Sequence, residues 1–150
     1  VEAVVQGCPA GLGDPVFDKI NARLAYALLS IGTIRGIEFG EGFAATKMRG
    51  SEHNDIFTVK SGKVRTKTNH AGGILGGITT GEDILLRVAV KPPSSIAQEQ
   101  DTVTVDKKAT RIQVKGRHDP CICPRVVPVV EAMIALALAD SLLIQKTIRP

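Results

Sequence analysis

The sequence predicts one α+β domain in which helices and strands form layers. Its 150 residues are the usual size of a single domain, and 43% hydrophobic with 23% charged residues is close to the average of soluble globular proteins. Short strand-like runs alternate with two helical patterns, and no repeat with a period of roughly 20–50 residues is present. We therefore expect residues 1–150 to form one domain without an internal boundary.

The chain begins with a strand and a helix. Residues 1–6 are rich in Val and run into a segment with Gly and Pro, which indicates a strand followed by a loop. From Val16 to Ile31, apolar residues recur at helical spacing while basic residues occupy another face. Asp14 can cap this helix, Pro15 suits its first turn, and Gly32 supplies a left-handed exit. An amphipathic helix is therefore expected after the first strand.

A second strand and a polar excursion follow. Residues 33–39 predict a strand, and residues 43–48 predict a helical turn or two. From residue 49 to about residue 68 the chain is polar. Four basic residues of this segment stand close together: Lys60, Lys63, Arg65 and Lys67. We expect a mobile surface loop here.

The second half predicts a buried strand, two exposed strand candidates and a long helix. Residues 84–90 are β-branched and leucine-rich and end at a Pro-Pro turn. Residues 102–105 are a short strand candidate, and residues 111–115 alternate charged and apolar side chains like a half-buried strand. Residues 126–144 are apolar almost all round but too polar for an easy membrane span. We expect a helix near the middle of the fold, covered on most sides.

Composition narrows the class of function. Lys and Arg exceed Asp and Glu by 19 to 15, and this net charge of +4 suits an anionic small molecule better than a polyanion. Aromatic residues make up only 3%, so no nucleic-acid partner is expected. Three cysteines cannot all pair, which favours a reducing compartment. Because the sequence starts with Val1 inside a strand, we expect a piece of a longer protein.

Three segments could bind or transform a ligand. Residues 71–77 contain four glycines, which admit a ligand or a neighbouring backbone but serve bends equally often. Residues 91–95 place an ammonium group and two hydroxyls on a rigid turn, where they suit a phosphate, although such a segment is more often only a turn. Residues 116–121 place a guanidinium, an imidazole and a carboxylate between a strand and a helix, a position that favours function modestly.

Two further patterns resemble ligand-binding motifs but lack the residues that such motifs require. Residues 40–45, GEGFAA, imitate a dinucleotide-binding turn, but the following helix is too short, and Lys60 and Lys63 stand where an acidic residue is needed. The pair Cys121 and Cys123 has the wrong spacing for zinc and lacks a second pair. We expect two small buried residues there and no metal site.

Three segments in this order resemble the chorismate synthase family: GLGDPVFDKINARLAYALLSIGTIRGIEFGEGF, NHAGGILGGITTGEDILLRVAVKPPSSI and GRHDPCICPRVVPVVEAMIALALADSLL. The resemblance runs from about Gly7 to Leu143 and corresponds to the C-terminal part of those enzymes. It implies a lyase that uses reduced FMN for the anti-1,4-elimination of phosphate from 5-enolpyruvylshikimate 3-phosphate, giving chorismate for aromatic amino acid synthesis. It also implies a β-α-β sandwich with helices between antiparallel sheets, a homotetramer and a cytoplasmic location, with a plastid still open.

The resemblance also implies roles for particular residues. Asp119 matches the family carboxylate near flavin N5, which helps that nitrogen take the substrate's C6 proton, and it is the only catalytic residue expected. Arg117 would face the anionic groups of the substrate and steady the departing phosphate. The flavin contacts would be Gly32, Thr33, Gly76, Lys91, Pro92, Pro93, Ser94, Ser95 and Arg117.

The sequence departs from the family pattern in three respects. Pro93 stands where Thr is common, which removes a hydroxyl and an amide donor, and Asp14 stands where Glu is common. The two general-acid histidines of the family belong to its N-terminal part, and neither His53 nor His118 matches them. We therefore expect the chain to be inactive alone. The alternative is a non-catalytic fragment that keeps oligomerisation surfaces, or a basic binding module that uses residues 60–67.

Overall fold

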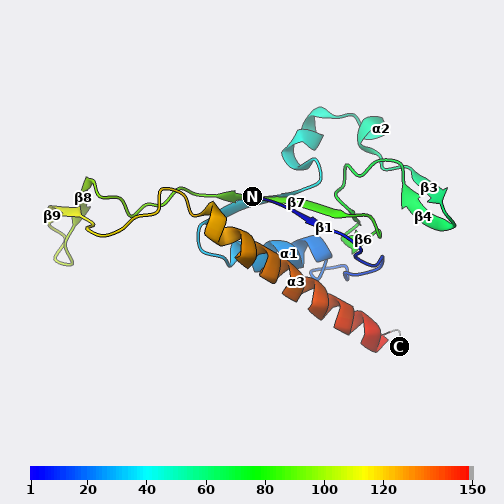
Figure 1. The fold of residues 1–150 in the computed structure, drawn as a ribbon. Helices are drawn as coiled ribbons and strands as arrows, with labels where there is room; N and C mark the ends of the chain where they lie inside the picture. Colours follow the sequence, from blue (N-terminus) through cyan, green and yellow to red (C-terminus); the bar gives the residue numbers. More distant parts are fainter. Residues whose placement is uncertain (149–150) are drawn as a thin grey trace.

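The centre of the fold is a three-stranded antiparallel sheet in the order β1-β7-β2. The structure is a computed structural model that describes residues 1–148. The central strand is β7 (Ile84–Val90), and it lies between β1 (Glu2–Val5) and β2 (Ile34–Phe39) (Figure 1). Because β1 and β7 are antiparallel, with Val5 opposite Ile84, the start of β1 lies at the end of β7. The predicted strands 1–6, 33–39 and 84–90 are all present.

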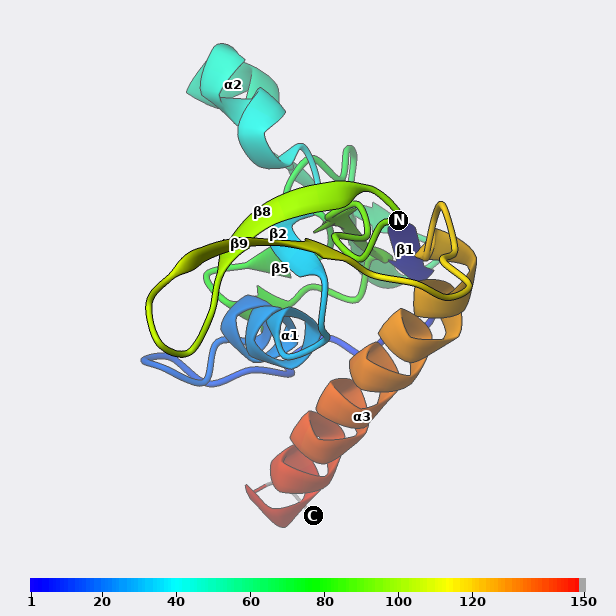
Figure 2. The same cartoon turned by 90° about the vertical axis from the view of Figure 1, so that its left-hand side faces the viewer.

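Two helices cover one face of this sheet. They are α1 (Ile20–Leu29) and α3 (Cys123–Ile148), and Figures 1 and 2 show both on the same side of β7. Alternate residues of β7 point toward them, and Ile84, Leu86 and Val88 are at most 4% exposed. The core therefore lies between this sheet face and the helix layer, which confirms the predicted α+β fold with layered helices and antiparallel strands.

The helix α1 is buried along one stripe, but it begins later than predicted. Its residues Ile20, Leu24 and Leu28 follow each other at four-residue spacing, and none is exposed. The prediction that Asp14 and Pro15 start the helix is wrong, because the first helical N–H group, that of Ile20, is bound by the carbonyl of Gly77 at 2.8 Å. Residues 14–18 form a turn instead.

The helix α3 is covered on one side only within the described residues. Its buried apolar residues Val126, Val130 and Ile134 face the core, whereas Leu136 and Leu143 on other sides are 65% and 63% exposed. The expectation that other layers cover this helix on most sides is therefore wrong for the described residues. By length and composition alone α3 could also cross a membrane, since its most apolar window has a mean hydropathy of 2.0 and is 17% buried, a test that core helices also pass.

Removing one methyl group from each side of α3 tests this orientation. We expect Ile134→Val to lower the free energy of unfolding by about 0.5–1.5 kcal/mol, because Ile134 is buried against the core. The matched change Ile144→Val removes the same group from a side chain that is 45% exposed and should have a smaller effect. Urea denaturation of both variants measures the difference, and equal losses would contradict the one-sided packing of α3.

The polar excursion is ordered as a short helical segment and a hairpin. The predicted turns at residues 43–48 are the 3-10 helix η1 (Gly42–Lys47), followed by α2 (Gly50–His53). The strands β3 (Phe57–Lys60) and β4 (Lys63–Thr66) then form a hairpin, which the expectation of a loop missed. Arg65 fixes this hairpin to the glycine-rich segment through the carbonyl of Gly81 at 2.6 Å and the carboxylate of Glu82 at 3.3 Å.

A second hairpin projects from the body. The strands β8 (Glu99–Val103) and β9 (Ala109–Gln113) pair only with each other and extend away from the sheet (Figure 1). We call residues 96–115 the arm. Strands were expected at 102–105 and 111–115, so the positions are approximately correct, but β9 is exposed along its whole length rather than half-buried. The two ends of the arm lead into residues 91–95 and 116–122.

Candidate functional site

The end of β7 brings two of the predicted site segments together. Lys91 directly follows β7, and its backbone N–H group donates to the carbonyl oxygen of Thr33 at 2.9 Å. The ammonium group of Lys91 also lies 3.3 Å from the hydroxyl of Ser94. Residues 32–33 and 91–95 therefore form one surface, where the connection from α1 to β2 meets the turn after β7. Pro92, Pro93 and Ser95 belong to the same turn.

Thr33 is unusual in this surface. It has a positive φ of 84°, a conformation that non-glycine residues rarely adopt, whereas Gly32 does not supply the left-handed exit that the sequence predicted. The Thr33 hydroxyl oxygen is buried and has no hydrogen-bond partner among the described residues. Buried hydroxyl groups are normally paired. Beside it, a Cβ atom on Gly32 would meet nothing within 4 Å, so this surface has space for a ligand.

Arg117 and Asp119 lie in a loop directly before α3. This loop joins the arm to α3 (Figures 1 and 2). The first turns of α3 line a common hollow with the strand β1. The N-terminal amine of Val1 donates to the carbonyl of Val88 at 3.1 Å, so the start of β1 lies at the end of β7. The arm thus connects two groups of predicted site residues: residues 91–95 before it, which meet residues 32–33, and Arg117 and Asp119 after it.

The loop before α3 and the first turn of α3 carry more positive than negative charge. Asp119 is the acidic group of this loop, and its side chain is 27% exposed. Its two carboxylate oxygens lie 3.1 Å from Arg125 and 3.5 Å from Arg117. The Arg117 side chain is 85% exposed, so its guanidinium can bind a further anion. Two guanidinium groups around one carboxylate leave a net positive charge here, which suits an anionic ligand.

Gly76 lies away from the surface at residues 32–33 and 91–95. It sits in the small hairpin formed by β5 (Ile74–Leu75) and β6 (Ile78–Thr79), next to the first residue of α1, whereas Thr33 follows the last turn of α1. The ten residues of α1 separate the two positions by about 15 Å. Gly76 has a φ of +61° and open space beside it. The described residues thus leave Gly76 as an open position that the rest of the predicted site does not adjoin.

Other glycines of the same run have a structural explanation. A Cβ atom on Gly72 would collide with the backbone of Gly40 and Leu85, and one on Gly73 would collide with the carbonyl of Asp83. Sequence reasoning had left ligand approach and close backbone packing evenly matched for this run. Close packing explains Gly72 and Gly73.

The residue that holds this run in place is Asp55, which sequence reasoning missed. Its carboxylate is 6% exposed and accepts hydrogen bonds from the Thr68 hydroxyl at 2.7 Å and from the backbone N–H groups of His70 at 2.9 Å and Ala71 at 2.8 Å. Burial alone would raise the pKa of Asp55, but these bonds and the nearby His70 outweigh it and lower the pKa. No spacing in the sequence distinguishes this Asp from an exposed loop residue.

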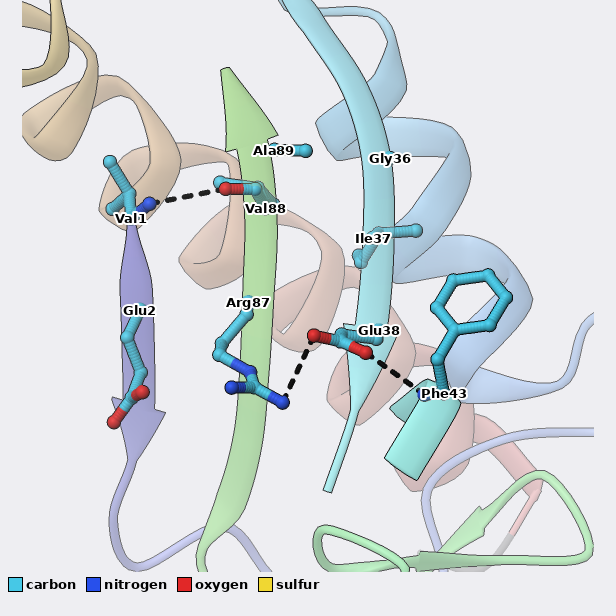
Figure 3. A pocket seen from close by; sticks show the side chains of 9 residues that line it. All are labelled: Val1, Glu2, Gly36, Ile37, Glu38, Phe43, Arg87, Val88 and Ala89. Atoms are coloured by element: carbon cyan, nitrogen blue, oxygen red, sulfur yellow. Dashed lines mark hydrogen bonds and ion pairs between the residues drawn. The ribbon is translucent and has the colours of Figure 1, made fainter. Parts of the chain in front are cut away.

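A second hollow lies on the outer face of the sheet, away from the helices. Its cavity is about 450 Å³ and is bordered by Gly36, Phe43 and Ala89 among others (Figure 3). Within it, Glu38 pairs with Arg87 at 3.0 Å and accepts a hydrogen bond from the Phe43 N–H group at 2.9 Å. Because these charged groups satisfy one another, this hollow has less capacity for an anionic ligand than the edge at Thr33 and Lys91.

The two thiols that follow Asp119 are accessible. The sequence led us to expect Cys121 and Cys123 to be buried, but Cys121 is exposed and Cys123 is partly exposed, so that expectation is wrong. Both stand where the loop turns into α3 and their side chains have solvent on one side. Among the described residues, no group of three or more His, Cys, Asp or Glu side chains could hold a metal ion.

The fold and this edge define an α+β protein with an anion-receptive surface, and comparisons identify its family. The family model for chorismate synthase matches residues 1–143. A chorismate synthase of Archaeoglobus fulgidus is 58% identical over 97% of this chain, and one of Methylacidiphilum infernorum is 55% identical over 99%. A crystal structure of chorismate synthase covers 96% of the chain with a TM-score of 0.76 and 33% identity. This chain belongs to the chorismate synthase family.

The chain is much shorter than its relatives. It spans 41% of the Archaeoglobus fulgidus protein, 40% of the Methylacidiphilum infernorum protein and 37% of the chain in the crystal structure. The described residues therefore correspond to part of the length of such a protein.

Proposed function

We propose that this chain is the C-terminal part of a chorismate synthase, a lyase that eliminates phosphate from 5-enolpyruvylshikimate 3-phosphate and forms chorismate with reduced FMN as cofactor. The observations that carry the proposal are the surface at the end of β7, where Lys91 meets Thr33, and the loop before α3, where Arg117 lies beside Asp119. Membership of the family supports the reaction, and the excess of cations supports two phosphorylated ligands. Residues 1–150 act as one domain in this proposal.

The residues at this surface fit a flavin. The unpaired Thr33 hydroxyl can donate to a polar ring atom, and the space beside Gly32 admits a flat ring next to the backbone. Lys91 and Ser94 supply donors for a phosphate or a polar edge. Pro93 supplies neither a hydroxyl nor an N–H group, so the turn binds through its neighbours. Reduced FMN supplies the electron-rich ring that assists the elimination.

The protein's own groups would orient the substrate and move a proton. Arg117, with most of its guanidinium in solvent, would bind a phosphate or carboxylate of the substrate and stabilise charge on the leaving phosphate. Asp119, held by Arg117 and Arg125, would position the proton that leaves the substrate at a ring nitrogen of the cofactor. Gly76 would contact a flavin only in a complete site, to which another part of the enzyme or a second subunit contributes.

The proposed reaction is tested on a longer enzyme in which an N-terminal part completes this chain. We expect chorismate and inorganic phosphate to form in equal amounts, and only when reduced FMN and 5-enolpyruvylshikimate 3-phosphate are both present. Absorbance of chorismate and a phosphate assay measure the two products. The 150-residue chain alone should be inactive, and rapid turnover by it would refute the proposal that the site is shared with another part of the enzyme.

A Lys91 variant tests the phosphate side of the flavin site. We expect Lys91→Ala to weaken FMN binding by the longer enzyme about 10–100-fold, because a hydrogen bond from a charged group contributes about 1.5–3 kcal/mol. Lys108→Ala is the matched control, since it removes the same charge from the exposed tip of the arm. Quenching of FMN fluorescence gives both dissociation constants, and equal values for the two variants would remove Lys91 from the cofactor site.

The proposed enzyme is a homo-oligomer, a tetramer as the family resemblance implies, and works in the cytoplasm. The uncovered sides of α3 and the exposed arm are consistent with further protein contacts. Neither a nucleic acid nor a membrane is part of the proposal. Sedimentation of the longer enzyme measures its oligomeric state. A filter-binding titration tests residues 60–67, and tight, steeply salt-dependent binding would support the basic-module alternative.

A further inference from the structure

The loop that carries Arg117 and Asp119 also carries two thiols with no role in the proposed reaction. Cys123 is the first residue of α3, and Cys121 precedes it by two positions. Cys121 is exposed, Cys123 is partly exposed, and both are free thiols. The third cysteine, Cys8, is 8% exposed and follows the far end of β1. The chain thus has one accessible pair of thiols, and it adjoins the candidate site.

The geometry allows this pair to form a disulfide. Residues two positions apart have Cα atoms at most about 7 Å apart, and disulfides span about 4.4–6.8 Å between Cα atoms. The neighbouring Cys121 thiol is also the main cause that raises the pKa of Cys123, with burial as the next cause. Cys121 is exposed and Cys123 is partly exposed, so an oxidant can reach both sulfur atoms.

We propose that Cys121 and Cys123 are a redox modification site, which a disulfide oxidant of the glutathione class converts into a disulfide within the loop, and that this disulfide reversibly switches off the site at Asp119. The effect on catalysis rests on the proposed function. The formation of the disulfide does not.

The reaction is a pair of thiol–disulfide exchanges. The Cys121 thiolate attacks one sulfur of the oxidant, the S–S bond of the oxidant breaks, and the departing thiolate takes a proton. The Cys123 thiol then gives its proton to solvent, and its thiolate attacks the Cys121 sulfur and releases the second thiol. Two protein thiols are oxidised, and one disulfide is reduced to two thiols. Because the pKa of Cys123 is raised, this second step should accelerate as the pH rises above neutral.

The modified residues flank the contacts of Asp119. Asp119 stands two residues before Cys121, and its partner Arg125, at 3.1 Å, stands two residues after Cys123. Closing a ring over residues 121–123 changes the backbone between these two partners at the start of α3. The Asp119 carboxylate is thereby displaced from the position that Arg117 and Arg125 hold. An accessible disulfide of this kind is readily reduced, which suits a reversible switch better than a structural cross-link.

Intact mass and thiol counting on the 150-residue chain test the modification directly. After treatment with oxidised glutathione under native conditions, we expect two of the three thiols to be lost, the mass to fall by about 2 Da, and dithiothreitol to restore both. Peptide mapping should join Cys121 to Cys123. Cys123→Ser should instead stop at a glutathione adduct on Cys121, while Cys8→Ser should behave like the unmodified sequence. A stable adduct on the unmodified chain, or a bond to Cys8, would overturn the proposal.

Activity of the longer enzyme tests the switch. Oxidation should abolish most of its turnover, dithiothreitol should restore it, and a variant with both Cys121→Ser and Cys123→Ser should keep its turnover after the same treatment. If the oxidised enzyme carries the mapped disulfide and remains fully active, the switch is refuted although the modification stands. If the reduced enzyme has no activity at all, the proposed function fails, while the mass and mapping results still decide whether the disulfide forms.

Discussion

Replacing Asp119 with Asn is expected to slow phosphate elimination by the longer enzyme about 10²–10⁴-fold, the usual effect of losing a positioned proton-transfer group. The amide keeps the size of the carboxylate but neither carries its negative charge nor accepts a proton. Arg117 and Arg125 then lose the anion that lies between them, at 3.5 Å and 3.1 Å. FMN binding should change much less, because the cofactor donors at Thr33, Lys91 and Ser94 lie on other segments.

Single-turnover kinetics separate these effects. The rate of chorismate formation at saturating substrate should fall, whereas the FMN dissociation constant from fluorescence quenching should stay close to that of the parent. Asp101→Asn is the matched control, since that carboxylate is 87% exposed on the arm and should leave both quantities unchanged. Turnover at the parent rate by Asp119→Asn would remove Asp119 from the mechanism, and a large loss of FMN affinity would make it a binding residue.

The central elements were predictable because their signals are local. In β7, a β-branched run that ends at two prolines indicated a buried strand, and its alternate residues Ile84, Leu86 and Val88 are buried. In α1 the four-residue spacing of Leu24 and Leu28 gave the buried side directly. Such patterns reflect burial against any apolar surface, so they do not depend on knowing the partner.

Boundaries and exposed hairpins were less predictable because distant contacts decide them. Asp14 and Pro15 have the residue types of a helix start, but the carbonyl of Gly77 binds the first amide of α1 at Ile20. The β3–β4 hairpin was missed because its apolar residues are exposed, so no buried alternation marks it. Its two-residue Ser61-Gly62 turn, with positive φ at both positions, was the signal that could have found it.

The candidate site was likewise predictable only where its signals are local. The motifs predicted three candidate segments, and the structure joins residues 32–33 to residues 91–95 and pairs Arg117 with Asp119. The sequence alone could not show that Gly76 lies far from the other site residues, because this distance arises from the length of α1 between Gly76 and Thr33. It also could not find Asp55, whose partners Thr68 and Ala71 lie 13 and 16 residues away.

Replacing Asp55 with Ala should destabilise the protein by about 2–4 kcal/mol, the largest stability effect expected in this chain outside the core. The change leaves the backbone N–H groups of His70 and Ala71 and the Thr68 hydroxyl without their common acceptor in a buried position. The glycine run that begins at Gly72 should then lose its fixed conformation. Urea denaturation at neutral pH measures the loss of unfolding free energy, and hydrogen exchange of the Ala71 amide locates it.

The stability that Asp55 contributes should depend on pH, whereas a simple loss of packing would be independent of pH. Because the pKa of Asp55 is lowered from its ordinary value of 3.8 in the folded protein, its stabilising contribution is complete above that value and is lost as the pH falls through the folded pKa. Asp55→Asn should therefore be less stable than the parent at neutral pH and approach it in acid. Asp106→Asn, exposed at the tip of the arm, should show neither effect. A difference between Asp55→Asn and the parent that is the same at neutral and acidic pH would show that the charge of Asp55 does not hold the glycine run.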